Sequence, residues 1–368
     1  MNDGRIFLSP PFVGAAERRA VSQAFDTGYV APCGPMVDEF ERRLARLAGR
    51  KYAVAVSSGT AAIDLLMEEL SVGPDTVVFA PTLTFIATVG PAYHRGAKLV
   101  FVDCDETGNV DVAELERALV GTRAKKLVVI GVDLYGRCCD YDAIAALCRR
   151  YGAKFVLDSA EAVGATYKGR PAGSAGLAAV YSFNGNKIVT TSGGGAIVTD
   201  SKALADRARK RSQQSREAKP WYEHREVGYD YRLSNVLAAI GLAQLERLPA
   251  VLRRRGEIAR FYRGRLGSLG TLAEYGRGSR PNHWLSLAFF PDRKARDRAL
   301  ARCARAGIEA RPVWKPMHLQ PVFKGAAVYG GAVAERLFAQ GLCLPSGTGM
   351  TPADLRRTVE AVTGDDGR

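Results

Sequence analysis

The sequence predicts an α/β protein built on a mainly parallel β-sheet. Between residues 50 and 200, short apolar segments typical of strands alternate with patterns typical of helices. Parallel neighbours need crossover connections, so this alternation indicates helices on both faces of the sheet. The chain has 368 residues, 47% of them hydrophobic, which is enough for one large and one small domain.

Seven apolar segments are predicted as strands, and two of the helices between them begin at recognisable caps. The strands are expected at residues 53–56, 76–80, 98–102, 126–132, 154–157, 177–180 and 196–199. Asp111, followed three residues later by Glu114, is typical of a capping box, and Asp140 is a second predicted N-cap. Each cap opens a helix after a strand, as a parallel sheet requires.

A domain boundary is predicted after the helical pattern at residues 233–248. Pro249 and an arginine-rich helix follow it, which divides the chain into a large domain (1–248) and a small C-terminal domain (249–368). The small domain is expected to be α+β, with a strand at 285–290, a helix near 297–306 and a strand at 308–311.

The charge of the chain leaves two classes of partner open. A net charge of +14, from 52 basic and 38 acidic residues, suits a nucleic-acid binder or an enzyme with anionic substrates. No nucleic-acid-binding motif accompanies the arginines, so we expect no nucleic-acid partner and keep a basic nucleic-acid-binding protein as the distant alternative.

Cysteine, histidine and hydropathy patterns predict a cytoplasmic protein without a metal. The seven cysteines contain no C-x-x-C pair, and the four histidines show no i, i+4 spacing. Neither a signal-peptide pattern in the first twelve residues nor an uninterrupted apolar run of about 18 residues is present, so no membrane segment is expected.

Candidate ligand-binding residues follow the first two strands. Ligands of open parallel sheets bind beyond the carboxyl ends of the strands. Gly59 and Thr60 belong to a Ser-Ser-Gly-Thr turn that opens a helix, where free N–H groups suit a phosphate, although a simple helix cap explains the turn equally well. Phe85, after the second strand, offers an aromatic plane, and its alternative is an ordinary core position.

Four further candidates lie near the ends of later strands. Asp158 closes the strand at 154–157, where a carboxylate is costly unless it meets a cation or donors, and Glu161 follows three residues later. Ser182 can add a hydroxyl to a phosphate site, and Lys187 lies on a loop between two strands, where it is either a solvated lysine or a Schiff-base nucleophile. A phosphate cradle, an aromatic plate, a partner for a pyridinium N–H and a Schiff-base lysine together describe pyridoxal 5'-phosphate (PLP).

Ordered motifs along nearly the whole chain resemble one enzyme family. They include Leu-Ser-Pro-Pro at 8–11, Ser-Ser-Gly-Thr at 57–60, Pro-Thr-Leu-Thr-Phe at 81–85, Asp-Ser-Ala-Glu at 158–161 and the segment around Lys187. The chain resembles the DegT/DnrJ/EryC1/StrS family of PLP-dependent nucleotide-sugar aminotransferases. The resemblance implies a fold-type I structure, with a mostly parallel seven-stranded sheet in the large domain and a small C-terminal α+β domain.

The resemblance also implies roles for the candidate residues. Lys187 would bind the cofactor covalently and shuttle the proton, Asp158 would face the pyridine nitrogen, and Phe85 would stack on the ring. Gly59, Thr60 and Ser182 would hold the phosphate, and Glu161 would lie near the phenolic oxygen. The site would lie between the subunits of a homodimer. Many relatives place an asparagine from the neighbouring subunit at the phosphate, and this chain has Asp230 at that position, where a carboxylate would repel the phosphate. Either the alignment is shifted here, or Arg232 compensates the charge, or Asp230 points elsewhere.

Three segments resemble the branch that aminates C4 of a UDP-linked 4-keto-6-deoxy sugar. These segments are 182–195, 311–318 and 342–347. The implied reaction moves the amino group of L-glutamate to UDP-2-acetamido-4-keto-2,6-dideoxyglucose on the bacillosamine route to a surface glycan, with Arg311, Trp314, Lys315 and His318 as candidate substrate residues. A C3 aminotransferase and a dTDP- or GDP-sugar aminotransferase are the alternatives. Dehydratases of the family carry histidine in place of the lysine, so Lys187 argues against that reaction.

Overall fold

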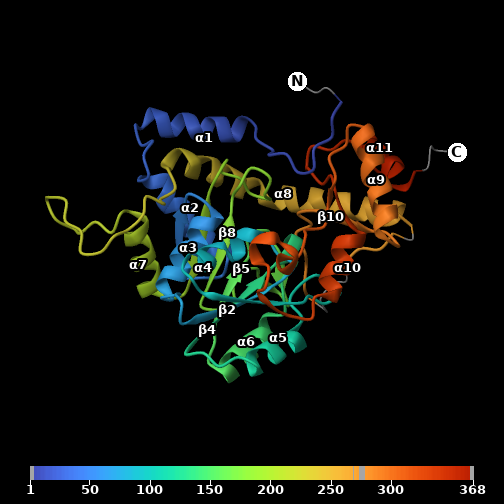
Figure 1. The fold of residues 1–368 in the computed structure, drawn as a ribbon. Coiled ribbons are helices and arrows are strands. Elements are labelled where there is room, and N and C mark those ends of the chain that lie inside the picture. Colours follow the sequence, from blue (N-terminus) through green and yellow to red (C-terminus); the bar gives the residue numbers. More distant parts are fainter. Residues whose placement is uncertain (1–3, 268, 273–277, 365–368) are drawn as a thin grey trace.

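A mainly parallel sheet of eight strands forms the centre of the computed structural model, which describes residues 4–267, 269–272 and 278–364 (Figure 1). In spatial order the strands are β1 (Tyr52–Val56), β9 (Gly195–Thr199), β8 (Ala178–Ser182), β5 (Lys154–Asp158), β4 (Lys126–Val132), β2 (Thr76–Pro81), β3 (Lys98–Val102) and β12 (Ala327–Tyr329). Among these strands β9 alone runs antiparallel to its neighbours, so the predicted α/β architecture is confirmed.

Seven strands of this sheet match the predicted segments to within two residues, and the eighth, β12, was missed. β12 pairs in parallel with β3, with Ala327 opposite Val100 and Tyr329 opposite Val102. The complete sheet therefore has eight strands, one more than expected for the large domain. β12 has only three residues and none is buried, so it is too short to show the alternation that identifies a strand.

Alternating strand residues supply a separate core on each face of the sheet. Ala53 and Phe79 point to one core, whereas Val54 and Val78 point to the other, because successive side chains of a strand face opposite sides. The first core is covered by α2 (Pro35–Leu47), α5 (Val112–Val120), α6 (Tyr141–Tyr151) and α8 (Asn235–Arg265), and α1 (Ala15–Asp26) packs on α8. The second is covered by α3 (Gly59–Glu69), α4 (Gly90–His94) and α7 (Lys202–Ser212).

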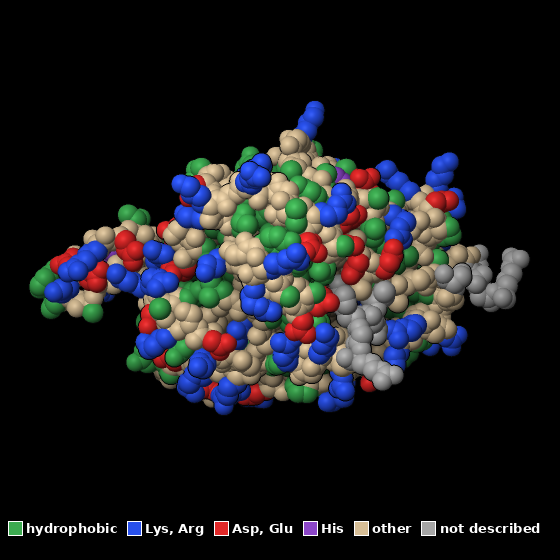
Figure 2. All heavy atoms as spheres, turned by 90° about the horizontal axis from the view of Figure 1, so that it is seen from below, with side chains coloured by type: hydrophobic (Ala, Val, Ile, Leu, Met, Phe, Trp, Pro, Cys, Tyr) green, Lys and Arg blue, Asp and Glu red, His purple; other side chains and the backbone are tan. Residues whose placement is uncertain are grey.

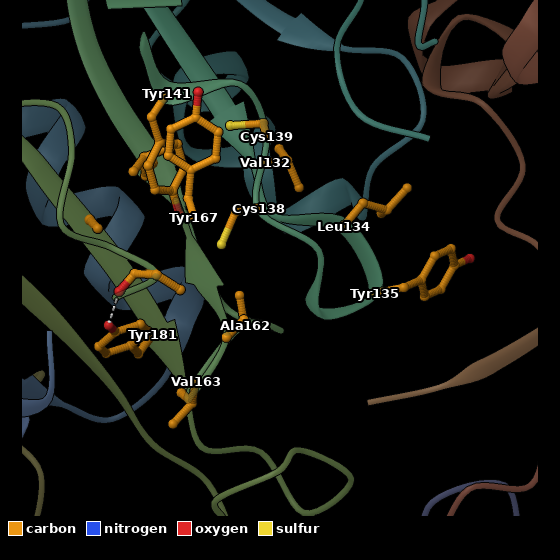
Figure 3. Packing of buried hydrophobic residues seen from close by; sticks show 14 of the residues in the cluster. Val132, Leu134, Tyr135, Cys138, Cys139, Tyr141, Ala162, Val163, Tyr167 and Tyr181 are labelled. Carbon is orange, nitrogen blue, oxygen red and sulfur yellow. Dashed lines mark hydrogen bonds between the residues drawn. The ribbon is translucent and has the colours of Figure 1, made fainter. Parts of the chain in front are cut away.

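The first core is rich in tyrosine near the end of β4. The rings of Tyr141 and Tyr167 lie 4.8 Å apart, beside the thiols of Cys138 and Cys139 (Figure 3). Burial raises the pKa of both thiols well above the ordinary value, so they remain protonated. All cysteines except Cys33 are buried and none forms a disulfide in the described residues.

The predicted helix caps at Asp111 and Asp140 are confirmed. The Asp111 carboxylate accepts hydrogen bonds from the amides of Ala113 and Glu114, and Asp140 accepts one from Ala143. Glu114 pairs with Arg117 rather than with the amide of Asp111, so the Asp111 cap acts without the reciprocal bond of a capping box.

The C-terminal part builds a second, three-stranded sheet with its own core. It contains β10 (Ser286–Phe289), β13 (Gly341–Leu344) and β11 (Arg311–Pro312), with α9 (Arg293–Arg305), α10 (Ala332–Gln340) and α11 (Pro352–Thr363). The strand expected at 308–311 is shorter and later, because Ile308 instead forms an isolated parallel bridge with Ile6. Smaller elements are β6 (Thr166–Tyr167), β7 (Arg170–Pro171) and the 3-10 helices η1 (Ile86–Thr88), η2 (Leu134–Gly136), η3 (Met317–Leu319) and η4 (Pro321–Phe323).

The helix break expected at Pro249 is wrong, because α8 continues through it to Arg265. An internal proline costs a helix roughly 3 kcal/mol. Residues on both sides of Pro249 are buried, including Leu248, Val251 and Ile258, and this burial compensates for the missing N–H. α8 is long and apolar enough to cross a membrane by length and composition, but it packs against the first core of the large sheet and the core of the C-terminal part. The division into residues 1–248 and 249–368 stays a prediction.

Candidate active site

A cavity of about 860 Å³ opens at the carboxyl edge of the large sheet. Val132, Asp158 and Ser182 line it at the ends of β4, β5 and β8, and the start of α3 and the loop after β2 complete this side. The cavity brings together nine of the eleven predicted site residues, namely Gly59, Thr60, Phe85, Asp158, Glu161, Ser182, Lys187, Arg311 and Trp314. Strand ends far apart in the sequence meet here because parallel strands share one carboxyl edge.

One corner of the cavity has free backbone donors. Ser58 caps α3 by accepting from the amide of Ala61, and the amides of Gly59 and Thr60 have no partner among the described residues. A side chain at residue 59 would place Cβ 3.1 Å from Cβ of Ser182, so glycine lets the helix start against the end of β8. This corner combines N–H groups, the positive end of a helix dipole and the Ser182 hydroxyl, which is an arrangement suited to a phosphate.

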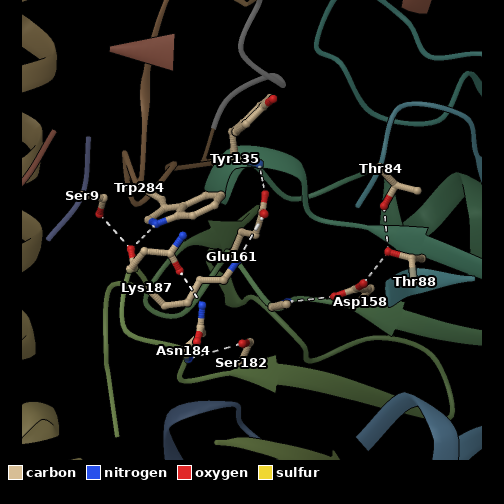
Figure 4. A network of polar contacts seen from close by, with 12 residues as sticks. Ser9, Thr84, Thr88, Tyr135, Asp158, Glu161, Ser182, Asn184, Lys187 and Trp284 are labelled. Carbon is tan, nitrogen blue, oxygen red and sulfur yellow. Dashed lines mark hydrogen bonds and ion pairs between the residues drawn. The ribbon is translucent and has the colours of Figure 1, made fainter. Parts of the chain in front are cut away.

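Asp158 is buried at the end of β5 and reaches the cavity. Its Oδ2 accepts from the Thr88 hydroxyl at 2.7 Å, and Oδ1 accepts from the amide of Ala160 at 3.1 Å (Figure 4). Oγ1 of Thr84 lies 2.7 Å from Oγ1 of Thr88, so the two hydroxyls and the Asp158 carboxylate form one hydrogen-bonded chain. Burial raises the pKa of Asp158, while these donors and the charge of Lys187 lower it. A protonated pyridine nitrogen would give this carboxylate the cationic partner that burial demands.

Lys187 points toward Glu161 in the same cavity. Its Nζ lies 3.2 Å from Oε1 of Glu161 and 3.9 Å from the centroid of the Trp284 ring (Figure 4). The other oxygen of Glu161 accepts from the amide of Tyr135 at 2.7 Å. Burial raises the pKa of Glu161 to about 7, although Lys187 opposes this shift. The amine is only 13% exposed and therefore lies inside the cavity rather than on a solvated loop.

Four aromatic side chains form a cluster at the border of the cavity. The ring of Trp314 lies 5.6 Å from Phe85, 5.0 Å from Tyr135 and 6.3 Å from Trp284. Phe85 is 56% exposed although it is a large apolar residue, because its ring faces the open cavity rather than the core. Such a cluster can stack on a planar ring or pack against a sugar.

These residues fit pyridoxal phosphate. The unpartnered amides at residues 59 and 60 suit its phosphate, buried Asp158 suits its ring nitrogen, and the Lys187 amine suits its aldehyde. The sequence model of the DegT/DnrJ/EryC1/StrS aminotransferase family matches residues 11–363. The chain belongs to this family.

Relatives agree with this assignment over almost the full chain. EpsN of Bacillus subtilis (strain 168), named as a pyridoxal phosphate-dependent aminotransferase, is 42% identical, and the alignment covers 97% of this chain and 95% of EpsN. GDP-perosamine synthase of Caulobacter vibrioides is 37% identical, with 97% of each chain covered. Spr1654 of Streptococcus pneumoniae, named as a sugar aminotransferase and solved in its PLP form, superimposes with a TM-score of 0.90 at 27% identity, covering 98% of each chain. The chain is a PLP-dependent sugar aminotransferase.

The four predicted substrate residues separate into two groups. Arg311 and Trp314 line the cavity, and Arg311 is exposed and paired with Glu309 at 2.9 Å. Lys315 and His318 are not among the residues that line it. His318 lies between the hydroxyl of Thr82, at 2.6 Å from Nδ1, and the carboxylate of Glu335, at 3.0 Å from Nε2. In this arrangement His318 links the 82–85 loop to α10.

Asp230 and Arg232 are not among the residues that line the cavity. Asp230 is exposed and forms a backbone bridge with Gln213. Arg232 is buried, and its Nη1 donates to the Glu41 carboxylate and to the carbonyl of Ala55. Arg232 is therefore held in the fold by α2 and β1.

Several residues around the cavity had not been predicted. Thr88 and Tyr135 contact the predicted residues, and the N-terminal segment 7–11 forms part of the cavity lining. Thr84 and Thr88 are spaced i, i+4 after a strand end, which is a weak signal for a shared face. From the sequence, Trp284 is, like Trp314, either a residue of the sugar pocket or an ordinary packing residue, and the structure places it in the cavity lining beside Lys187.

Proposed function

We propose that this enzyme transfers the amino group of L-glutamate to the C4 ketone of a nucleotide-linked 4-keto-6-deoxy sugar. The arrangement of Lys187, buried Asp158 and the α3 N-terminus around one cavity carries this proposal. The bound cofactor supplies an electron sink and an aldehyde for the exchange of amines. The enzyme is proposed to act in the cytoplasm.

Each cofactor contact is proposed from the position of one group. The Asp158 carboxylate would hold a proton on the pyridine nitrogen, the amides of Gly59 and Thr60 with the Ser182 hydroxyl would bind the phosphate, and Phe85 would cover the ring. Glu161 would lie near the phenolic oxygen. Lys187 Nζ would bind the cofactor aldehyde. Once released, the amine would carry the proton between Cα of the amino donor and C4′ of the cofactor.

The sugar nucleotide is proposed to be UDP-2-acetamido-4-keto-2,6-dideoxyglucose, for a surface glycan. Support comes from the segments 182–195, 311–318 and 342–347, which resemble the UDP-sugar C4 branch. Arg311 and Trp314 would contact this substrate, because both line the cavity. A GDP-linked 4-keto sugar is the second candidate, since a GDP-perosamine synthase is 37% identical over 97% of the chain.

The test is a panel of UDP-, dTDP- and GDP-linked 4-keto sugars offered with glutamate. We expect the highest kcat/KM for the UDP sugar and an amine at C4, which NMR of the product identifies. A preference for the GDP sugar would replace the first candidate by the second. Borohydride reduction followed by peptide mapping should place the cofactor on Lys187, and turnover by Lys187→Ala would refute its catalytic role.

A projecting arm supports the proposal of a homodimer with active sites at the subunit interface. The segment 213–231 extends from the body of the molecule beyond α7, and Figure 2 shows it standing clear on one side. Trp221, Tyr222 and Val227 on this arm are 58%, 80% and 95% exposed. Exposed apolar side chains on an extended arm favour burial against another subunit. Sedimentation of the wild type and of Tyr222→Ser tests this, and a monomeric wild type would refute it.

A further inference from the structure

Arg255 is a buried cation without an acidic partner, directly behind the active site. It lies on α8 in the run 253–255, but Arg253 is exposed and Arg254 pairs with Glu257. Arg255 is 3% exposed, and its guanidinium has no carboxylate partner among the described residues. Burial lowers its pKa to about 10, so it stays charged at neutral pH. A buried charge is costly, which points to a specific task for this one.

The partners of Arg255 are Ser9 and Trp284. Nη1 donates to the backbone carbonyl of Trp284 at 2.7 Å, and Nη2 donates to Oγ of Ser9 at 3.0 Å. An arginine can only donate, so the Ser9 hydroxyl accepts from it and must direct its own hydrogen elsewhere. That hydrogen goes to the carbonyl oxygen of Asn186 at 2.7 Å.

Trp284 contacts the same carbonyl oxygen from the other side. Its Nε1 donates to the Asn186 oxygen at 2.7 Å, so this oxygen accepts from two side chains that are both held by Arg255. Figure 4 shows Ser9 and Trp284 converging beside Lys187. We call Arg255, Ser9, Trp284 and the Asn186 carbonyl the Arg255 clamp.

The clamp acts on the backbone of Lys187. The Asn186 carbonyl belongs to the planar peptide group that contains the Lys187 nitrogen, and this nitrogen donates to the carbonyl of Asn184 at 2.9 Å. The carbonyl oxygen and the N–H of this peptide group are therefore both hydrogen-bonded. These bonds fix the orientation of the peptide plane and hence the direction in which the Lys187 side chain leaves the loop. The Trp284 ring also lies 3.9 Å from Lys187 Nζ, so the clamp contacts both ends of the residue.

We propose that Arg255 is a positioning residue for Lys187. Through Ser9 and Trp284 it holds the loop that carries the amine, and it joins three remote parts of the chain at this point: the N-terminal segment, α8 and the stretch before β10. This inference rests on the proposed role of Lys187. Arg255 touches neither cofactor nor substrate, and it acts on the reaction by keeping the amine in line with the cavity.

The test compares Arg255→Met and Ser9→Ala with the wild-type holoenzyme. A misplaced reacting group costs on the order of a hundredfold, so Arg255→Met should lower kcat by roughly tenfold to a hundredfold with both KM values within about twofold. Removal of the buried cation should also move the pH-dependent change of the bound cofactor's absorption band to higher pH, because a positive charge nearby disfavours protonation. The charged groups that face Lys187 from other elements, Asp158 and Glu161, stay in place in both variants. Ser9→Ala removes one link of the clamp but keeps the buried cation, so it should lower kcat by a smaller amount and leave the absorption band in place, even where Arg255→Met folds poorly.

Arg302→Met is the matched control. Arg302 also binds two backbone carbonyls, those of Ala361 and Val362, but it lies on α9 in the C-terminal core. It should change thermal stability without moving the absorption band or kcat. Wild-type kcat in both Arg255→Met and Ser9→Ala, with an unmoved band in Arg255→Met, would refute the clamp. Borohydride labelling of a residue other than Lys187 in the wild type would instead refute the proposed function.

Discussion

Asp133 and Asp158 lie at the carboxyl ends of neighbouring strands, one residue apart in register, and their surroundings differ. Asp158 is the last residue of β5 and pairs with Val132, whereas Asp133 follows the end of β4; both are buried. Because successive residues of a strand face opposite sides, this offset of one residue sends the two carboxylates to different surroundings. Asp133 accepts from the hydroxyls of Tyr141 and Ser159 and from the amide of Cys139, so protein donors enclose it. Asp158 accepts from Thr88 and Ala160 and also lines the cavity.

A carboxylate at a strand end can bind a ligand only where part of it faces a cavity, as Asp158 does and Asp133 does not. Burial raises the pKa of Asp133 to about 6 and also raises that of Asp158. Asp133 offsets the cost of burial with internal donors and holds the loop that follows β5 through Ser159. Asp158 has fewer protein donors, and the proposed pyridinium N–H would supply the rest.

Asp158→Asn should produce the largest loss of activity. An amide cannot hold a proton on the pyridine nitrogen as a carboxylate does, so kcat should fall on the order of a hundredfold to a thousandfold. The unfolding free energy should change little, because the amide oxygen can still accept from Ala160 while the new N–H donates to the Thr88 hydroxyl, which can direct its own hydrogen to Thr84. Steady-state kinetics and urea unfolding measure the two effects, and near-normal kcat would place Asp158 with Asp133 as a structural carboxylate.

Asp133→Asn should show the opposite pattern. One of the three donors around Asp133 would lose its acceptor, at a cost of about 1–3 kcal/mol in unfolding free energy. The kcat of the folded enzyme should be unchanged. A large loss of kcat at normal stability would reverse the comparison between the two aspartates.

The stability difference between the wild type and Asp133→Asn should depend on pH, because the pKa of Asp133 is raised in the folded state. The folded pKa of Asp133 is about 6 and the ordinary value is 3.8, so the folded state binds the proton more tightly between these values. Its contribution to stability is complete below pH 3.8 and is lost as the pH rises through 6. The stability difference between wild type and Asp133→Asn should therefore be larger at pH 4 than at pH 7, as urea titrations at both pH values would show.

Thr88→Val should lower kcat by an intermediate amount, because Thr88 contacts Asp158 at the cavity. It removes the hydroxyl that donates to Asp158 while keeping the shape of the side chain, so the pKa of Asp158 should rise further. A lost hydrogen bond to a charged group corresponds to a decrease in kcat of roughly tenfold. Thr190→Val is a control, because Thr190 bonds only to backbone groups of residues 183 and 192 through its hydroxyl. Equal kinetics for the two variants would contradict the role of Thr88.

Glu161→Gln should have the smallest effect on the maximal rate and a visible effect on the pH profile. The Glu161 pKa of about 7 makes this carboxyl neutral below that pH and charged above it. If the charge of Glu161 assists Lys187, kcat/KM of the wild type should rise as the pH passes 7. In Glu161→Gln this rise should be absent, and above pH 7 its kcat/KM should be lower than that of the wild type by about tenfold or less. A step that persists in the variant would assign it to another group.

Local patterns in the sequence were sufficient for most of the sheet and for the family. The seven predicted strands, the caps at Asp111 and Asp140, and the approach of Gly59, Asp158 and Lys187 to one edge follow from hydrophobic periodicity and strand order. The continuation of α8 through Pro249 was not predictable, because helix-breaking propensity is local whereas the burial that overrides it is tertiary. β12 was missed for a related reason, since an exposed edge strand of three residues has no periodicity.

The sequence by itself determined the α/β class, the aminotransferase family and the identity of the lysine most suited to bind PLP. These depend on residues close together in the chain, whose types and spacing express their physical role directly. Only the tertiary structure decided which of two buried aspartates faces the cavity, and that Arg255 is tied to the loop of Lys187. Thr88 is 70 residues from Asp158, and Ser9 is 177 residues from Asn186. Such contacts arise when the sheet and its helices pack, and the spacing of residues along the chain carries no direct trace of them.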